Sequence, residues 1–261
     1  MNPPEYPFVV ACCVTGKSPW HIEHVLPQAI QAFAEQTYPP DRMAMVLVCE
    51  REEEIEPIRA IVSNQLCWRG IAFSVGCDKP PLGNLRNAAL DEAARTADGD
   101  RHLVIQWDDD DWHHPDRIAE QVKHWRAAPE KPCFLHRQLC YSWTHDTAYV
   151  REFPNTFIHG TILHINEPHV RYPVQGKEED SVFLGNWPAY THWPNDPCLY
   201  VRFDHGRNTW DHRHIMREVA DEHGKWDVKP EQAEFLREVL REYSLPLSGS
   251  PAAEGCLTGT A

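Results

Sequence analysis

No part of the 261-residue sequence supplies the roughly 20 consecutive apolar residues that a membrane-spanning helix needs. The N-terminal segment MNPPEYPFVVACCVTGK also lacks the basic stretch with which a secretory signal peptide begins. The nine cysteines are an odd number and include no Cys-x-x-Cys pair, which is typical of reduced thiols. We therefore expect a cytoplasmic protein with no transmembrane segment and no cleaved signal peptide.

Positive charge is scarce, because 25 Lys and Arg residues stand against 39 Asp and Glu residues and give a formal net charge of −14. This balance argues against an extended surface for nucleic acid or for anionic membranes. It does not exclude anionic ligands, because a bound divalent cation can reverse the local sign of the charge. The hydrophobic content of 42% and the ten tryptophans are sufficient for a packed globular core.

The first half of the chain alternates between apolar runs and amphipathic stretches. Pro27 is expected to kink the first of the helices that this pattern predicts. Such alternation indicates a mostly parallel sheet with helices on both faces, in which ligands bind beyond the carboxyl ends of the strands. The predicted strands are 8–16, 43–50, 71–77 and 102–107, and the predicted helices are 21–36, 54–66, 82–97 and 116–128.

From Pro132 the pattern changes to shorter strands, so the second half is expected to be more antiparallel. Small and polar residues at 246–261 predict a disordered tail, and neither a repeat nor an interdomain linker is visible. We therefore expect one domain over residues 1–245. The predicted elements of this half are strands at 132–143, 147–153, 156–165 and 198–205 and helices at 176–187 and 230–243.

Four consecutive aspartates follow the strand predicted at 102–107, at the edge of the sheet where ligands bind. In an extended turn, residues two apart point the same way, so Asp108 and Asp110 can converge on one cation. Their oxygen ligands select Mg²⁺ or Mn²⁺, which commonly bridge to a substrate phosphate. The competing interpretation is a solvated acidic loop, in which Asp111 or Asp116 caps the helix that follows.

The segment LVIQWDDDDWHHPDRIAEQV resembles the Asp-x-Asp segment of the family 2 glycosyltransferases, which have the GT-A fold. Three further motifs occur in the family's order within about residues 8–211, and four elements in order are far more specific than one. GNLRNAAL resembles the family's helix start and places Arg86 and Asn87. GKEEDSVFL resembles its glycine-then-Glu-Asp segment and places Glu179 and Asp180. LYVRFDHGRNTWD resembles its late His-x-x-Asn-Thr element and places His205. The resemblance implies an α/β, Rossmann-like, mostly parallel sheet flanked by helices.

The resemblance also implies a reaction: inverting, metal-dependent transfer of a hexosyl or related group from a nucleotide-diphosphate donor to a hydroxyl acceptor. Asp108, Asp110 and His205 are implied to hold Mn²⁺ or Mg²⁺, which stabilises the charge on the leaving diphosphate. Asp180 is implied to be the general base for the acceptor hydroxyl. Asp111 and Glu179 are expected to support the site, the latter as an ordinary acidic residue at a helix start.

The residues implied to bind the donor are Thr15, Glu50, Arg86, Asp108 and Asp109, with Arg86 on the phosphates and Glu50 near the ribose or base. The first strand ends CVTGK where the family has a Pro-Thr-Tyr-Asn turn, and the second ends LVCERE instead of Val-Asp-Asp-Gly. Both segments normally hold the base, so its identity stays open. Two of the predicted site residues also have a purely structural interpretation. His205 would then be a hydrogen-bonding residue at a strand end, and Arg86 would lie on a solvated helix face.

By the same resemblance, a nucleotide-binding half is expected at about 7–128 and an acceptor-binding, catalytic half at about 129–245. The acceptor is left open between a glycan, a lipid-linked sugar, a peptide and a small molecule. Since acceptors of this family are often lipid-linked, peripheral attachment to a membrane also stays open. Nucleic acid is not expected as a partner.

Two other functions stay open. A nucleotidyltransferase on a related fold would attack the α-phosphate, but it usually has a Gly-rich first loop with Lys or Arg, and this chain offers only TGK. A catalytically inactive nucleotide- or carbohydrate-binding protein would keep the fold, and the retained EED segment argues against it. ACCVTGKS fits a phosphate-binding loop only loosely because it reads as strand interior, and WHHPD and WDHRHI lack the histidine spacing of a zinc site.

Overall fold

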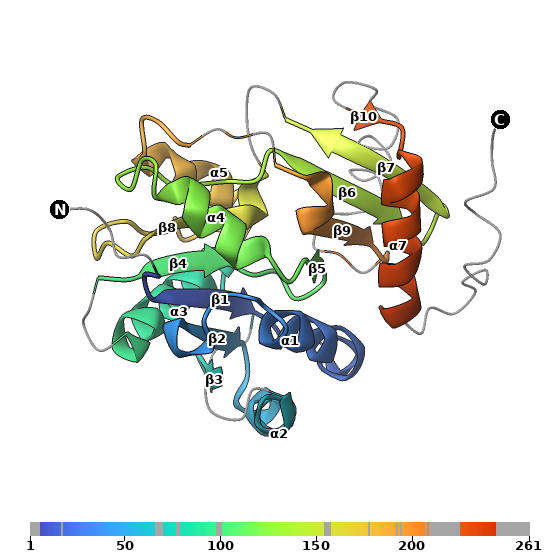
Figure 1. The fold of residues 1–261 in the computed structure, drawn as a ribbon. Helices are drawn as coiled ribbons and strands as arrows, with labels where there is room; N and C mark the ends of the chain where they lie inside the picture. Colours follow the sequence, from blue (N-terminus) through green and yellow to red (C-terminus); the bar gives the residue numbers. More distant parts are fainter. Residues whose placement is uncertain are drawn as a thin grey trace.

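The computed structural model places two β-sheets side by side, with helices packed around them (Figure 1). The predicted tail at 246–261 and the motif residues 209–211 lie outside the described residues. Within the described residues, no helix combines the length and the apolar character required to span a membrane. The structure describes residues 6–16, 18–65, 70–76, 79–97, 101–153, 158–176, 178–191, 193, 195–206, 208 and 225–243.

The first sheet has the strand order β3-β2-β1-β4-β8, and every pair except β4 with β8 is parallel. The predicted mostly parallel sheet is therefore confirmed. Three of its parallel strands, 9–14, 43–49 and 103–106, are almost entirely buried, which explains why they read as continuous apolar runs in the sequence. The strands are β1 (Val9–Val14), β2 (Met43–Cys49), β3 (Gly70–Ser74), β4 (Leu103–Gln106) and β8 (Leu163–Ile165).

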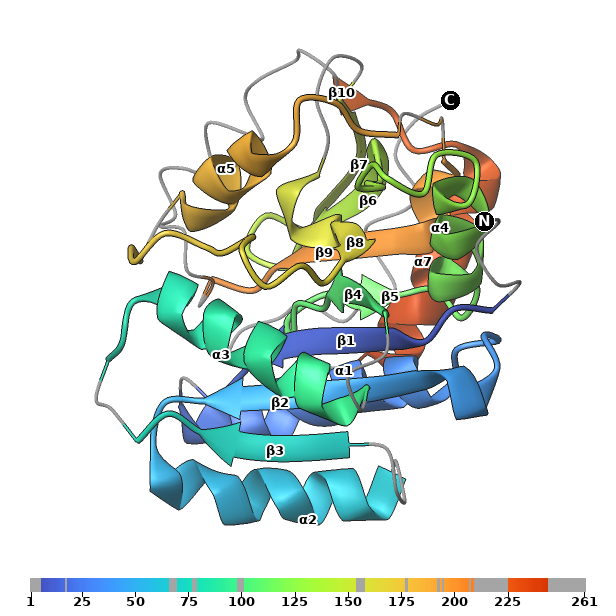
Figure 2. The same cartoon turned by 90° about the vertical axis from the view of Figure 1, so that its left-hand side faces the viewer.

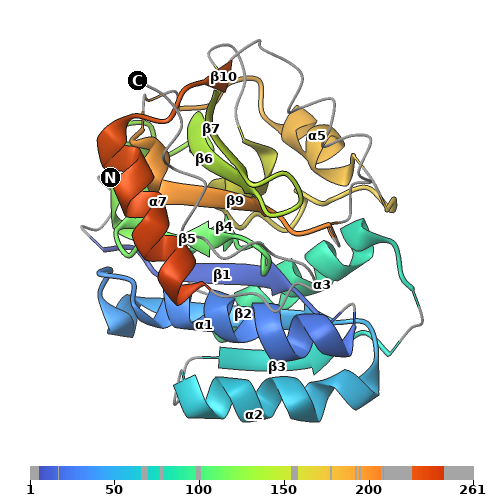
Figure 3. The same cartoon turned by 90° about the vertical axis from the view of Figure 1, so that its right-hand side faces the viewer.

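Helices cover both faces of this sheet, as the alternation of strands and helices predicts. Alternate residues of each strand point to opposite faces, so the strands contribute to two separate cores. One core includes α1 (Leu26–Ala34), α2 (Ile55–Gln65) and α4 (Arg117–Trp125), and the other includes α3 (Leu82–Thr96) and Phe183 of α5 (Glu179–Phe183). Figure 2 shows α3 on one face, and Figure 3 shows α1 on the other.

The helix predicted over 21–36 is divided next to Pro27. The π-helical turn η1 (His21–Val25) leads directly into α1, with Pro27 in the first turn of that α-helix. Proline is tolerated there because the first N–H groups of a helix have no partner within it. Short 3₁₀ turns occur elsewhere in the chain: η2 (Pro40–Arg42), η3 (Glu52–Glu54), η4 (His159–Thr161), η5 (Leu184–Asn186) and η6 (Pro197–Leu199).

The second sheet has the order β10-β7-β6-β9-β5 and is antiparallel except between β6 and β9. The more antiparallel second half is thus confirmed. Helix α7 (Pro230–Glu242) covers one face of the sheet (Figure 3). Its Leu236 and Val239 belong to the same buried core as residues of β6, β7 and β9. The strands are β5 (Trp112–His113), β6 (Arg137–Ser142), β7 (Thr147–Glu152), β9 (Tyr200–Asp204) and β10 (Lys225–Trp226).

The order of the strands along the chain does not follow the division into two sheets. In the described part of the strand predicted at 156–165, the strand is Leu163–Ile165, and it pairs with β4 of the first sheet instead of joining the second. Conversely, β5 follows the aspartates and pairs with β9 of the second sheet. The aspartates therefore lie in the segment that leaves the first sheet and enters the second.

Candidate functional site

The last of the four aspartates, Asp111, ties this acidic segment to β9. It is buried, its Oδ2 accepts a hydrogen bond from the Tyr200 hydroxyl, and its Oδ1 accepts one from the backbone N–H of Phe203 at 3.0 Å. Burial, reinforced by the charges of Asp110 and Asp108, raises the pKa of the Asp111 carboxyl well above its usual value. Asp111 thus joins the acidic segment to the strand that ends next to His205.

The expectation that Asp111 or Asp116 caps the following helix through its side chain is wrong. Asp116 occupies the position before α4 but makes no capping hydrogen bond, and its Oδ1 instead accepts from the Thr37 hydroxyl at 2.7 Å. The carboxylate of Asp111 is drawn to the donors of β9. The carboxylates of Asp111 and Asp116 both accept hydrogen bonds from donors outside α4, so neither caps the free N–H groups of its first turn.

A buried cation lies beneath the acidic segment. Arg117 is completely buried, with its guanidinium 5.1 Å from the Trp107 ring and 5.2 Å from the Tyr200 ring. It donates hydrogen bonds to the backbone oxygen of Gln106 at 3.1 Å and to the ring of His113. Burial lowers the pKa of Arg117 to about 10, which leaves it positively charged at neutral pH. This charge partly offsets the repulsion among the aspartates above it.

Asp108, directly after Trp107, is held from three sides. Its Oδ1 accepts a hydrogen bond from the Gln106 side chain at 3.1 Å and lies 3.8 Å from Nη2 of Arg86. Its Oδ2 lies against Gly160 of η4, so closely that a Cβ at that position would overlap it. Neither Gln106 nor Gly160 was among the site residues predicted from the sequence.

Arg86 connects Asp108 to helix α5. The guanidinium Nε donates to Oε1 of Glu179 at 2.9 Å, and the group lies 5.5 Å from the Tyr172 ring. Only 13% of the side chain is exposed, so the alternative of Arg86 on a solvated helix face is wrong. Burial disfavours its charge, but Asp108, Tyr172 and the acidic residues of α5 outweigh burial and raise the pKa of Arg86.

The two acidic residues at the start of α5 differ in environment. Glu179 is buried against Arg86, and burial, reinforced by Asp180, raises the pKa of its carboxyl while Arg86 opposes this. Its expected role as an ordinary helix-start residue is therefore incomplete, because the carboxylate is also half of an ion pair. Asp180 is half-buried, and its Oδ1 accepts from the N–H of Ser181 at 2.8 Å.

Asp110 and His205 come together on the other side of the acidic segment. The Nε2 of His205 lies 3.5 Å from Oδ2 of Asp110, and the imidazole packs beside the rings of Trp20 and His21. Asn208 donates to Oδ2 of Asp110 at 3.3 Å and accepts from the backbone N–H of His205 at 3.1 Å. Asn208 belongs to the late His-x-x-Asn-Thr motif, so that motif could have identified it.

The remaining predicted donor residues lie at the same sheet edge. Thr15 and Glu50 directly follow β1 and β2, at the carboxyl ends of these strands. Thr15 is fully buried, and in the described part of the chain its hydroxyl has no hydrogen-bond partner. Asp109 is also almost completely buried. Among the described residues, neither Thr15 nor Glu50 makes a hydrogen bond or ion pair with the aspartates.

Asp108, Asp110 and His205 carry carboxylate oxygens and an imidazole nitrogen, which are ligand types that divalent cations accept. Adjacent ligands of one octahedral Mg²⁺ lie about 3 Å apart, close to the 3.5 Å between Asp110 and His205. Across the described residues, no group of three or more His, Cys, Asp or Glu side chains is arranged around one point as a metal site. Magnesium sites of this kind commonly use one or two protein ligands and complete their shell with substrate phosphate and water.

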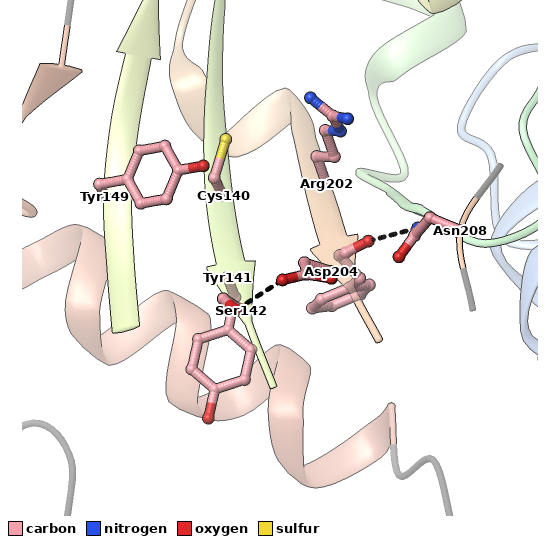
Figure 4. Close-up of a pocket in the computed structure, with 8 residues that line it drawn as sticks. Cys140, Tyr141, Ser142, Tyr149, Arg202, Asp204 and Asn208 are labelled. Atoms are coloured by element: carbon pink, nitrogen blue, oxygen red, sulfur yellow. Dashed lines mark hydrogen bonds between the residues drawn. The ribbon is translucent and has the colours of Figure 1, made fainter. Parts of the chain in front are cut away.

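A small hollow lies next to Asn208 on the second sheet (Figure 4). Asp204 borders it and accepts hydrogen bonds from Ser142 at 2.7 Å and Thr144 at 3.0 Å. Because Asn208 contacts both this hollow and Asp110, the hollow adjoins the acidic segment. The lining residues are Cys140, Tyr141, Ser142, Tyr149, Arg202, Phe203, Asp204 and Asn208.

Comparison with known proteins gives one family and several similar structures. The family described as "Glycosyl transferase family 2" matches residues 18–172, more than half of the chain. The chain is similar to S. aureus TarS, with a TM-score of 0.52 and 14% identity, over 90% of this chain and 43% of that one. It therefore spans less than half the length of that TarS chain. No curated protein matches it significantly.

Two structures with bound ligands are also similar. TarS 1-349 in complex with UDP-GlcNAc has a TM-score of 0.52 and 10% identity, over 92% of this chain and 68% of that one. The mannosyltransferase PcManGT from Pyrobaculum calidifontis, in complex with GDP-Man and Mn²⁺, has a TM-score of 0.52 and 17% identity, over 92% and 71%. At such identities the similarity establishes the fold, and the predicted GT-A fold is confirmed.

Proposed function

Because the chain belongs to glycosyl transferase family 2, we propose that it transfers a sugar from a nucleotide-diphosphate donor to a hydroxyl acceptor, with inversion at the anomeric carbon. The observation that carries the proposal is the position of Arg86, which contacts Asp108 on one side and Glu179 on the other. One cation thereby connects the acidic segment at the sheet edge to the helix that bears Asp180. The nucleotide sugars bound to TarS and PcManGT support the same class of donor.

The proposed metal ligands are Asp108, Asp110 and His205, with Mn²⁺ or Mg²⁺ as cofactor. When bound, the ion supplies Lewis-acid stabilisation of the negative charge that develops on the leaving diphosphate. Asp111 supports this set by holding the acidic segment against β9. The Mn²⁺ in PcManGT supports the choice of metal.

Donor binding is assigned to Arg86, Thr15, Glu50, Asp108 and Asp109. Arg86 has a permanently charged, planar guanidinium that matches phosphate oxygens. Its ion pair with Glu179 holds the guanidinium in one orientation before the donor arrives. Thr15 and Glu50 follow the two strands whose ends are expected to contact the nucleoside.

Asp180 is the proposed general base, which accepts the proton of the acceptor hydroxyl. Glu179 is a poor candidate because its side chain is only 4% exposed and is paired with Arg86. Asp180 is half-buried and its Oδ1 is oriented by the Ser181 N–H, so its carboxylate is partly accessible to an acceptor. The proposed division places the donor at about 7–128 and the acceptor at about 129–245, in a cytoplasmic protein.

Product analysis with one pair of variants tests the reaction class. The protein is incubated with Mn²⁺ and a panel of UDP- and GDP-sugars, and released nucleoside diphosphate is measured in the presence of hydroxyl acceptors. Asp180→Asn should lose at least 100-fold in rate, as expected for loss of a general base. The control Glu178→Gln changes an exposed acidic neighbour and should retain activity. Release of pyrophosphate would instead identify a nucleotidyltransferase, and an active Asp180→Asn would remove the assigned base.

Chelation tests the metal. EDTA should abolish transfer, and Mn²⁺ or Mg²⁺ should restore it. Asp110→Ala should weaken donor binding more than acceptor binding, because Asp110 would hold the ion that stabilises the charge on the donor's diphosphate. Full activity in EDTA would show that the aspartates act without a cation.

A further inference from the structure

We propose that Tyr172 is a positioning residue that holds Asp108 in a fixed relation to helix α5, which carries Asp180. The proposal rests on the proposed function for the roles of Asp108 and Asp180. Tyr172 lies in the segment between β8 and α5, outside every motif of the sequence analysis. Its backbone, its ring and its hydroxyl each contact a different part of the candidate site.

The backbone of Tyr172 is fixed to α3 by Asn87. The Asn87 amide donates to the carbonyl oxygen of Tyr172 at 2.9 Å, and its oxygen accepts from the N–H of Tyr172 at 2.9 Å. One residue further along, the carbonyl of Pro173 lies so close to Gly83 that a Cβ there would overlap it. The N–H of Gly83 also donates to Gln175 at 3.0 Å. Tyr172 is therefore anchored to the helix that carries Arg86.

The ring of Tyr172 packs against α5. It stacks on Phe183 with the ring centroids 3.7 Å apart and an angle of 5° between the planes. Phe183 is the last residue of α5, whose first turn contains Glu179 and Asp180. Since both rings are buried, the stack limits how far this short helix can shift relative to α3.

The hydroxyl of Tyr172 connects to the acidic segment through Gln106. It donates to Oε1 of Gln106 at 3.4 Å, and Nε2 of Gln106 donates to Oδ1 of Asp108 at 3.1 Å. A carboxylate can only accept, so the NH₂ group of Gln106 must face Asp108 and its oxygen must face Tyr172. Both hydrogen bonds are therefore donated in the same direction, from Tyr172 to Gln106 and from Gln106 to Asp108.

These contacts give Tyr172 two separable effects. Loss of the hydroxyl releases the Gln106 amide and with it Oδ1 of Asp108, while the stack on α5 stays. Loss of the ring also removes the support of α5 and therefore affects Asp180. Tyr172→Phe and Tyr172→Leu distinguish the two effects.

Binding of MnCl₂ in the presence of UDP or GDP, measured by electron paramagnetic resonance of free Mn²⁺, tests the first effect without activity. Tyr172→Phe should weaken Mn²⁺ binding roughly 5-fold, the equivalent of one buried hydrogen bond, and leave the acceptor KM unchanged. Tyr172→Leu should weaken it similarly and also lower kcat. Tyr38→Phe is the matched control, because Tyr38 is a buried tyrosine whose hydroxyl donates to Pro7 at 2.6 Å. This control should lose thermal stability without changing Mn²⁺ affinity.

A double-mutant comparison tests the route through Gln106. In the Gln106→Met background, Tyr172→Phe should have no further effect on Mn²⁺ affinity, because the connection to Asp108 is already broken. Independent, additive losses would overturn the proposal, as would a Tyr172→Phe protein that behaves like Tyr38→Phe. Wild-type protein that binds no Mn²⁺ with either nucleotide would overturn the metal site of the proposed function. Normal wild-type binding that Tyr172→Phe leaves intact overturns only the role of Tyr172.

Discussion

Arg117 donates a hydrogen bond to Nδ1 of His113, and this contact determines the tautomer of the imidazole. Because a guanidinium has no acceptor, Nδ1 must be unprotonated and Nε2 must carry the hydrogen. The Nε2–H then donates to the backbone carbonyl of Asp108 at 3.0 Å. Burial, reinforced by Arg117, lowers the pKa of His113 well below its usual value, so the ring stays neutral. A buried cation thus acts on the acidic segment through a neutral histidine.

Substitution of His113 tests this connection. His113→Phe preserves the aromatic packing on Trp107 but leaves Arg117 and the Asp108 carbonyl without this partner. We expect a loss of about 1–3 kcal/mol in the free energy of unfolding, measured by urea denaturation. His113→Gln supplies both an acceptor and a donor and should recover a substantial part of the loss. Equal stability of the Phe and Gln variants would contradict the tautomer argument.

Arg86 and Glu179 form a buried ion pair, and removing one partner should destabilise the fold more than removing both. Arg86→Met leaves the Glu179 carboxylate buried without its cation and should cost about 3–5 kcal/mol. The double variant Arg86→Met/Glu179→Leu should recover most of this, because both charges are gone. It should nevertheless fail to bind nucleoside diphosphate in calorimetry. A double variant no more stable than Arg86→Met would argue against the pair as described.

Gly160 gives Asp108 room against η4. In Gly160→Ala the new Cβ would overlap Oδ2 of Asp108, which is the end of a side chain and can turn away. The fold should therefore lose less than about 1 kcal/mol, while Mn²⁺ affinity in the presence of UDP or GDP falls by about 10-fold or more. Gly185→Ala is the control, since an added Cβ there meets no described atom within 4 Å. Unchanged metal affinity in Gly160→Ala would mean that the orientation of Asp108 is unimportant.

His164 should make stability depend on pH. It is buried beside Phe183, its Nδ1 contacts the carbonyl of Ile165 at 2.7 Å, and burial lowers its pKa from 6.5 to about 4. Between these values the unfolded chain binds the proton more readily than the folded one. Stability from the neutral ring is therefore complete above pH 6.5 and is lost toward pH 4, by about 3 kcal/mol in total.

The measurement is urea denaturation of wild type and His164→Asn from pH 7 to pH 4. Asparagine retains a donor for Ile165 but does not titrate, so the variant should lose less stability over this range. His169→Asn removes an exposed histidine and should behave as wild type. Parallel pH curves for wild type and His164→Asn would show that His164 does not contribute.

The sequence was most informative where burial imposes a pattern. The apolar run 43–50 predicted β2 to within one residue, because a strand buried on both faces must be apolar throughout. Strand β5 was missed because its two residues lie in a polar segment and show no period. The strand predicted at 156–165 was assigned without its partner, and only the fold shows that it returns to β4.

The candidate site followed the same division. Arg86, Asp108 and Glu179 were identified from local motifs, and they do meet in space. Gln106 reads as the interior of an apolar strand, and Tyr172 as an isolated aromatic residue, so neither carries a local signal. Their contacts join residues 66 positions apart in the chain, which a single sequence does not encode in any spacing.

The positions of β5 and β8 in the two sheets limit how this protein can be engineered. A fragment that stops after α4 would lose β8 and expose the backbone edge of Leu103–Gln106. An exposed strand edge of this kind can pair with a strand of another molecule. A chimaera that keeps the first half of this chain and replaces the second must therefore retain Leu163–Ile165 and supply a new partner strand for Trp112–His113. Because the chain passes between the two sheets more than once, no single cut in the sequence separates one sheet from the other.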